Sequence, residues 1–302
     1  MKQILFAVLC LYSTAAIACD ACGISAGNQG LGLLPQQYKY FAALQYQYRS
    51  FSTMHEAEGS SSTSTTSSEQ YRTMQFWGKV SLSNRIMVFA FVPYQMNLRE
   101  EAGNTTQYSG IGDMSVLVNA AIIKPKCDGV FSHSLFAGAG VKLPTGKYGA
   151  INTETGDNTL NMYPGTGSVD VMMNANYTLS YHRMGINSEA SYTATTPKNA
   201  YKYGDKFLCS MLYFYRLQKK NLSIVPQAGI RYEYALHDYT NYNRKWLNEA
   251  TGGSTMFGSV GVQAFYKHIG AQLSYYMPVS QNYAQGMVIA KQRFDAGVLI
   301  LF

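Results

Sequence analysis

The chain has 302 residues, of which 47% are hydrophobic and 14% charged, and it contains 27 glycines and 25 tyrosines against 8 prolines. Its net charge of +7 is scattered and forms no basic stripe with interleaved aromatics, so the sequence gives no support to a nucleic-acid partner. Beyond the N-terminus, no stretch reaches the roughly 18 continuous apolar residues of a membrane helix, so a membrane location would require a closed β-barrel.

The N-terminus has the pattern of an export signal over residues 1–18. Lys2 is its one charge, an apolar run follows, and Ala16 and Ala18 are the small residues expected before a cleavage site. Residues 19–37 are Gly-rich and weakly patterned, and we expect either a periplasmic leader or a short plug folded into the lumen. Residues 38–302 are then an outer-membrane β-barrel.

A Cys-x-x-Cys motif, formed by Cys19 and Cys22, opens the predicted leader. It lacks the following His that covalent haem attachment requires. Three interpretations stay open: a local disulfide, a redox pair, and a ligand set for a soft metal such as copper. Cys19 also permits lipidation after cleavage. Apart from this soft metal, the sequence indicates no cofactor.

Alternating polar and apolar residues divide the rest of the chain into segments of about ten residues, the length that a tilted strand needs to cross a bilayer. In the first segment Tyr40 and Leu44 fall on one face, and Gln45 and Arg49 fall on the other. Lipid on one side and water on the other would select this split. We therefore predict an all-β fold, a single antiparallel transmembrane barrel of twelve strands, over residues 38–49, 71–82, 86–98, 110–123, 132–143, 168–179, 185–195, 205–217, 222–236, 256–266, 269–277 and 291–302.

An even strand count returns both termini to the periplasm. The predicted outer connections are long and polar, over residues 52–70, 99–109, 144–167, 196–204, 237–255 and 278–290. The predicted inner connections are short, over residues 83–85, 124–131, 180–184, 218–221 and 267–268. The last strand puts Phe294, Val298 and Phe302 on one face and ends on an aromatic ring, which looks like the insertion signal of a bacterial outer-membrane barrel. The predicted location is the bacterial outer membrane, with its lipid as a partner.

The predicted inward face carries polar and charged side chains on most strands. We expect this set to line the lumen and contact a solute: Lys39, Gln45, Gln47, Arg49, Gln75, Lys79, Asp113, Asn119, Asp170, Asn174, Glu189, Gln227, Arg231 and Glu233.

Three Gly-containing motifs carry a family resemblance. They are Ser-Gly-Ile-Gly-Asp-Met at residues 109–114, Leu-Pro-Thr-Gly at 143–146, and Gly-Thr-Gly-Ser-x-Asp at 165–170. Together they resemble the outer-membrane barrels of the MetA pathway of phenol degradation; the overall pattern spans residues 110–302. The resemblance implies a channel for small, often aromatic or hydrophobic solutes.

The same motifs have a physical interpretation of their own. Gly110 and Gly112 allow a bulge or kink where a strand leaves a loop, so that Asp113 points into the lumen. Asp113 and Asp170 would need solvent or a cation, and Arg216 and Arg231 are candidate partners. The two acids either order the outer loops or belong to a solute-binding constriction.

The function that the sequence favours is passive passage of a small, hydrophobic or aromatic solute, without energy coupling. Two alternatives stay open: a metal-handling or redox role of Cys19 and Cys22, and a structural or surface-adhesion barrel that uses the Ser/Thr-rich run over residues 60–68, expected to be a surface loop. An enzyme is not expected, because nucleophilic catalysis needs a Ser within reach of a His. The adjacent His133 and Ser134 would point to opposite faces of their strand.

Overall fold

The computed structural model describes residues 39–55, 65–125, 130–149, 160–198, 200–240, 245–248 and 251–302. The predicted export signal and leader lie outside these residues, and so do Cys19, Cys22 and Cys127. The plug and the metal or redox role of the Cys-x-x-Cys motif therefore stay predictions.

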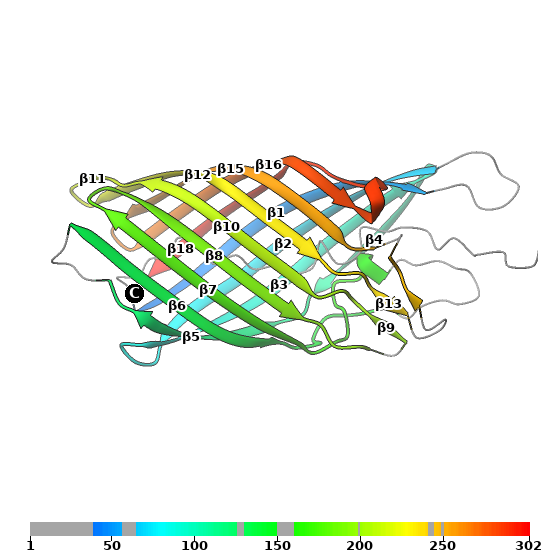
Figure 1. The fold of residues 1–302 in the computed structure, drawn as a ribbon, viewed down its shortest axis with the longest axis horizontal. Coiled ribbons are helices and arrows are strands. Elements are labelled where there is room, and N and C mark those ends of the chain that lie inside the picture. Colours follow the sequence, from blue (N-terminus) through cyan, green and yellow to red (C-terminus); the bar gives the residue numbers. More distant parts are fainter. Residues whose placement is uncertain are drawn as a thin grey trace, which may run out of the picture.

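The described residues form a closed antiparallel barrel of twelve strands, as predicted (Figure 1). Strands that follow one another in sequence pair in the sheet, and β1 closes the ring by pairing with β18, with Phe41 opposite Leu301 and Tyr48 opposite Phe294. The ring consists of β1 (Tyr40–His55), β2 (Thr65–Ser81), β3 (Ile86–Glu101), β4 (Asn104–Ile111) followed by β5 (Ser115–Ile123), β6 (Phe131–Lys142), β7 (Asp170–Tyr181), β8 (Met184–Ala194), β10 (Lys206–Tyr215) followed by β11 (Leu217–Lys219), β12 (Leu222–Ala235), β15 (Gly253–Tyr266), β16 (Ile269–Tyr283), and β17 (Val288–Ala290) followed by β18 (Arg293–Leu301).

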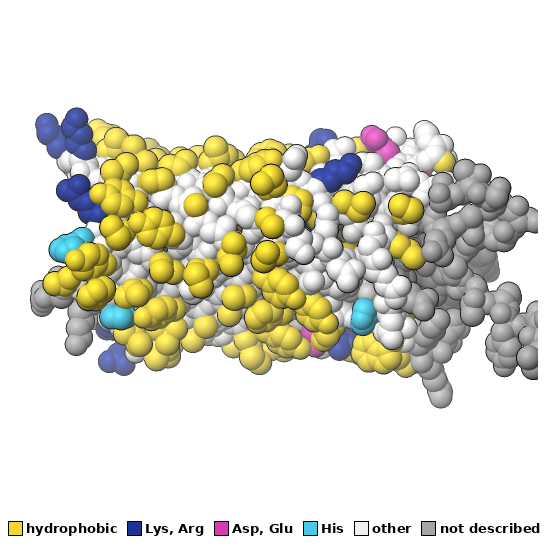
Figure 2. Space-filling model, turned by 45° about the horizontal axis from the view of Figure 1, so that its top comes forward, with side chains coloured by type: hydrophobic (Ala, Val, Ile, Leu, Met, Phe, Trp, Pro, Cys, Tyr) yellow, Lys and Arg dark blue, Asp and Glu magenta, His cyan; other side chains and the backbone are white. Residues whose placement is uncertain are grey.

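Exposed apolar side chains form a broad belt around the outside of the barrel (Figure 2). In β1, Leu44 is exposed while Ala43 beside it is buried. In β18, Val298 and Ile300 are 54% and 52% exposed, whereas Leu299 between them is 4% exposed. The predicted two-faced character of the first and last strands is confirmed, and the belt is the surface that hydrocarbon covers.

The strands extend farther at the outer end than the sequence pattern predicted. β1 continues to His55, and β2 begins at Thr65 inside the Ser/Thr-rich run, where Ser67 is completely buried. The loop expected over residues 99–109 is a tight turn at Ala102 and Gly103, both with positive φ, between β3 and β4. These loop predictions were wrong because strand pairing continues above the membrane, where lipid no longer selects an alternating sequence.

Additional short elements lie at the outer end. The strands β9 (Tyr201–Lys202), β13 (Tyr239–Thr240) and β14 (Lys245–Trp246) form a separate three-stranded sheet. Two 3₁₀ turns, η1 (Leu160–Met162) and η2 (Ala284–Gly286), are also present. Within the part of the chain that the structure describes, no helix has the length and apolarity needed to cross a membrane.

The barrel interior is layered along its axis, with a polar layer between two apolar clusters. The inner cluster, near the short turns, consists of Phe41, Ala43, Trp77, Phe89, Phe91, Leu117, Met172, Leu299 and Leu301. The outer cluster, near the long connections, consists of Phe51, Tyr71, Leu160, Met162, Tyr201, Tyr203, Leu247, Phe257, Tyr283, Ala284, Val288 and Ala290. The polar layer shows clearly along β1, where the inward residues between Ala43 and Phe51 are Gln45, Gln47 and Arg49.

We predict that Val298→Arg lowers the free energy of unfolding by about 2–4 kcal/mol, because it puts a charge on the lipid face in the middle of the belt. The measurement is urea unfolding of the barrel in phospholipid vesicles, with Val298→Ala as the control. If the Arg and Ala variants unfold at the same urea concentration, the face assigned to lipid is wrong.

Candidate functional site

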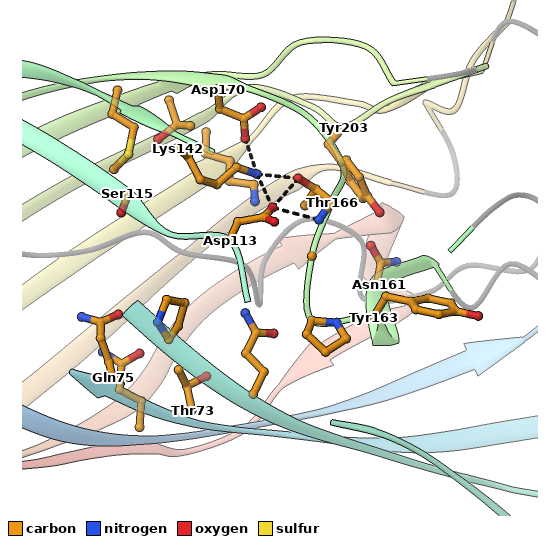
Figure 3. A pocket seen from close by; sticks show the side chains of 18 of the residues that line it. Thr73, Gln75, Asp113, Ser115, Lys142, Asn161, Tyr163, Thr166, Asp170 and Tyr203 are labelled. Atoms are coloured by element: carbon orange, nitrogen blue, oxygen red, sulfur yellow. Dashed lines mark hydrogen bonds and ion pairs between the residues drawn. The ribbon is translucent and has the colours of Figure 1, made fainter. Parts of the chain in front are cut away.

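A segment of the connection between β6 and β7 folds into the barrel. Leu160 and Met162 of η1 are 7% and 1% exposed, and both belong to the outer cluster. The Asn97 side-chain amide donates a hydrogen bond to the Met162 carbonyl at 2.9 Å, and the Tyr203 hydroxyl donates to the Leu160 carbonyl at 3.4 Å. Residues 160–167, which we call the inward segment, therefore narrow the lumen from the outer side (Figure 3).

The three Gly-containing motifs meet where the inward segment touches the barrel wall. A Cβ atom built on Gly165 would lie 2.6 Å from the Gly146 carbonyl carbon, and one built on Gly146 would lie 2.9 Å from the carbonyl carbon of Gly112. The Thr145 hydroxyl donates to the Gly112 carbonyl at 3.0 Å and accepts from the Met114 amide at 2.8 Å. Only glycine lets three backbones approach this closely, which explains the glycine in each motif.

The two predicted acids share one cation, the ammonium group of Lys142 (Figure 3). Lys142 Nζ lies 3.1 Å from Asp113 Oδ2 and 2.6 Å from Asp170 Oδ2, and it donates to the Thr166 hydroxyl at 2.5 Å. Asp113 Oδ2 also accepts from the Thr166 amide at 2.9 Å, which ties the inward segment to the wall. We call Lys142, Asp113, Asp170 and Thr166 the lysine node.

The predicted partners of the two acids were wrong. Arg216 is an exposed residue at the inner end of the barrel. Arg231 instead bonds Glu233 at 2.7 Å, and Arg293 bonds the same carboxylate at 2.8 Å. The side chains of Lys142, Asp113 and Asp170 are 4–14% exposed, so an unpaired carboxylate there would be costly, and Lys142 supplies the compensating charge.

A cavity of about 50 Å³ lies between the lysine node and the opposite wall, where Thr73 and Gln75 project from β2 (Figure 3). Roughly 10–15 Å³ suffices for one water molecule, so the cavity holds several waters or part of a small solute. Most of its lining residues are polar or charged, but their carbon atoms, together with Leu160, Met172, two prolines and two tyrosines, also give it much apolar surface. The lining residues are Gln47, Arg49, Thr73, Gln75, Pro93, Gln95, Asp113, Ser115, Lys142, Leu160, Asn161, Tyr163, Pro164, Gly165, Thr166, Asp170, Met172, Thr193, Tyr203 and Lys206.

Several buried polar atoms in the interior have no protein partner. The side-chain amide nitrogen and oxygen of Asn119 and of Asn174 are buried without a hydrogen bond to protein, and so is the hydroxyl of Ser191. They lie close together, because Asn119 and Asn174 each pair with Gly138 and Asn174 pairs with Ser191 across the sheet. Buried polar groups in proteins almost always have a partner, so this row requires water or a polar solute.

The predicted lumen residues occupy three places. Five line the cavity: Gln47, Arg49, Gln75, Asp113 and Asp170. Eight others share the inward face outside the cavity: Gln45, Lys79, Asn119, Asn174, Glu189, Gln227, Arg231 and Glu233. Lys39 is exposed at the inner rim. Contact of any of them with a solute stays a prediction.

Sequence reasoning missed Lys142, Lys206 and the inward segment. Lys142 has a clear signal, because it continues the inward positions Ser134 and Phe136 at even spacing along β6. The inward segment has a weaker one, the apolar Leu160 and Met162 within a connection that is otherwise polar.

The adjacent His133 and Ser134 lie on opposite faces of β6, as predicted. Ser134 is 3% exposed, whereas His133 is exposed and its Nδ1 lies 2.7 Å from the Tyr177 hydroxyl. Over the residues that the structure covers, no group of three His, Cys, Asp or Glu side chains is arranged to hold a metal ion. Cys209 is exposed on the outside of β10.

No protein family and no curated protein matches this sequence. Among solved structures, an outer-membrane channel from Pseudomonas putida F1 matches 89% of this chain and 100% of its own with a TM-score of 0.65, at 11% identity. The β domain of the Bordetella autotransporter Brka matches 87% of this chain and 99% of its own (TM-score 0.48, 11% identity). A Pseudomonas aeruginosa FadL homologue matches 94% of this chain and 98% of its own (TM-score 0.43, 10% identity).

The protein is a bacterial outer-membrane β-barrel. The closed ring, the external apolar belt and the fold shared with the Pseudomonas putida channel agree on this. Because both termini of the ring lie at the end with the short turns, that end faces the periplasm.

We predict that Lys142→Met lowers the free energy of unfolding by about 3–5 kcal/mol, because it leaves two buried carboxylates without their cation. The triple variant Lys142→Met, Asp113→Asn, Asp170→Asn should regain much of this loss. Urea unfolding in vesicles measures both variants. A single variant as stable as the wild type, or a triple variant no better than the single one, contradicts the assigned role of Lys142.

Gly165→Ala should lower the free energy of unfolding by about 1–3 kcal/mol, because its methyl group would meet the Gly146 backbone. Gly258→Ala is the matched control, since the nearest atom there is a Val279 methyl at 3.4 Å. The same unfolding measurement applies, and equal stability of the two variants would show that the three motifs do not pack as described.

Proposed function

We propose that the barrel is a passive channel for a small solute of hydrophobic or aromatic character. The observation that carries the proposal is the cavity of about 50 Å³ inside a closed barrel, beneath the inward segment, with both charged and apolar side chains in its lining. A barrel that served only as a membrane anchor would have no need of a charged cavity at its centre that is large enough for several water molecules. The unpartnered atoms of Asn119 and Asn174 support the same conclusion, because they need an occupant of the lumen.

The apolar clusters on either side of the cavity favour a hydrophobic or aromatic solute. A solute leaving the cavity toward the periplasm meets the inner cluster, where the Trp77 and Phe91 rings are stacked with centroids 5.6 Å apart. Displacing such rings costs least when apolar solute surface replaces them, because no polar group is then stripped of water without compensation. Ions and sugars would lose their water without compensation in this cluster, so their passage would cost more free energy.

The resemblance of the three Gly-containing motifs to barrels of the phenol-degradation pathway supports this choice of solute. In this chain those motifs supply Asp113, Thr166 and Asp170 of the lysine node and hold the inward segment, so the resemblance falls on the part that constricts the lumen. We propose that Gln47, Gln75 and Arg49 contact the polar part of the solute in the cavity. The other inward residues predicted from the sequence would form the rest of the route.

The proposal predicts that proteoliposomes containing lipopolysaccharide and the barrel take up 4-nitrophenol faster than empty ones, but take up glucose no faster. The double variant Leu160→Ser, Met162→Ser should raise the uptake rate further, because it weakens the packing of the inward segment in the outer cluster.

The matched control is Met211→Ser with Leu273→Ser, which makes similar changes on the lipid face, where these residues are 51% and 53% exposed. Uptake no faster than in empty vesicles, for both the wild type and the inward-segment variant, would refute the channel. Equal acceleration of glucose and 4-nitrophenol would keep the channel and refute the solute class.

A further inference from the structure

The periplasmic end of the barrel carries a ring of exposed basic side chains. Figure 2 shows Lys and Arg side chains gathered at the end opposite the long connections. The ring consists of Lys39, Arg85, Lys124, Arg183, Arg216, Lys219, Lys220 and Lys267, all exposed. The described residues of this rim include no Asp or Glu.

The residues that the structure describes at the opposite end carry both signs of charge. There, basic and acidic side chains occur together and pair, as in Arg99 with Glu101 at 2.8 Å and Lys202 with Asp205 at 3.3 Å. Among the described residues, exposed cations without acidic side chains nearby are therefore gathered at one rim, which the scattered positions in the sequence did not reveal.

The basic residues sit where the apolar belt ends. Each lies next to exposed apolar residues of the same turn, such as Leu82 near Arg85, Leu217 beside Arg216, and Ile269 near Lys267. Lys267 Nζ also lies 5.5 Å from the centre of the Tyr266 ring, which is itself 55% exposed. Long basic side chains in this position keep their stems on the apolar surface and bring their charges to head-group level.

The distribution of the charges identifies the kind of partner. They come from five different turns and from the residue before β1, so they surround the barrel instead of forming a patch on one side. A partner that contacts all of them must itself surround the barrel at the level of the bilayer surface. A collar of lipid does so, whereas a protein docked on one side would reach only some of these charges.

We propose that this basic rim binds the phosphate groups of anionic phospholipids in the periplasmic leaflet. The lipids would occupy the shell around the barrel, with one acidic head group held by each basic side chain or pair. This binding site is independent of the lumen and of the solute.

The test measures how strongly spin-labelled phosphatidylglycerol, compared with spin-labelled phosphatidylcholine, associates with the purified barrel in phosphatidylcholine vesicles. We expect a preference of roughly threefold or more for the anionic lipid at low salt, and its loss near 1 M NaCl, where charges are screened beyond about 3 Å. The triple variant Arg216→Gln, Lys219→Gln, Lys220→Gln should reduce the preference, and replacement of all eight basic residues by Gln should abolish it.

The matched control removes three exposed cations from the outer end through Lys147→Gln, Lys198→Gln and Lys291→Gln, and it should keep the wild-type preference. Heat-dependent electrophoretic mobility verifies that each variant is folded. The proposal is overturned if the wild type shows no preference, if the folded triple variant keeps it in full, or if the control loses as much as the rim variant. The wild-type salt titration decides the matter even if the eightfold variant does not fold.

Discussion

The structure depends on one constraint: within hydrocarbon, every backbone amide and carbonyl must be bonded inside the protein. The pairing of β1 with β18, from Phe41 opposite Leu301 to Tyr48 opposite Phe294, removes the last free edge. This register also fixes the faces, because a slip of one residue would turn every side chain of a strand to the other side. The lining of the lumen thus follows from the ring.

The same constraint explains how well the strands could be predicted. Where lipid contacts the barrel, the two-residue period is enforced, and all twelve strands lie where the sequence indicated. Above the membrane the period is no longer enforced, so Thr65 and Ser67 belong to β2 although their surroundings look like a loop. The prediction of a long loop over residues 99–109 was wrong for the same reason. A hairpin in water needs only a suitable turn, which is here at Ala102 and Gly103.

The site was predicted in part. The alternating pattern predicted that Asp113 and Asp170 lie on the inward face, because the residues of one strand are enough to determine which side chains point inward. Their shared partner, Lys142, depends on how three strands and a loop come together. The fourth strand of the ring breaks between β4 and β5, and this break lets Asp113 approach Lys142 of β6. Neither the break nor the entering loop leaves a periodic signal. The glycine motifs indicate where the site lies in the sequence. The structural role of the glycines depends on backbone contacts between Gly112, Gly146 and Gly165, which are distant in sequence.

The hydrogen bonds named above for the inward segment differ in kind between its two ends. At Thr166 its amide and hydroxyl both donate to the Asp113 carboxylate, and Lys142 donates to the same hydroxyl, so three bonds involve a charged group. At η1 the two bonds from Asn97 and Tyr203 are between neutral groups, and the longer spans 3.4 Å. Charge-assisted hydrogen bonds are roughly twice as strong as neutral ones. The burial of Leu160 and Met162 in the outer cluster adds to these two bonds, and an apolar solute of the proposed class would compete for that contact.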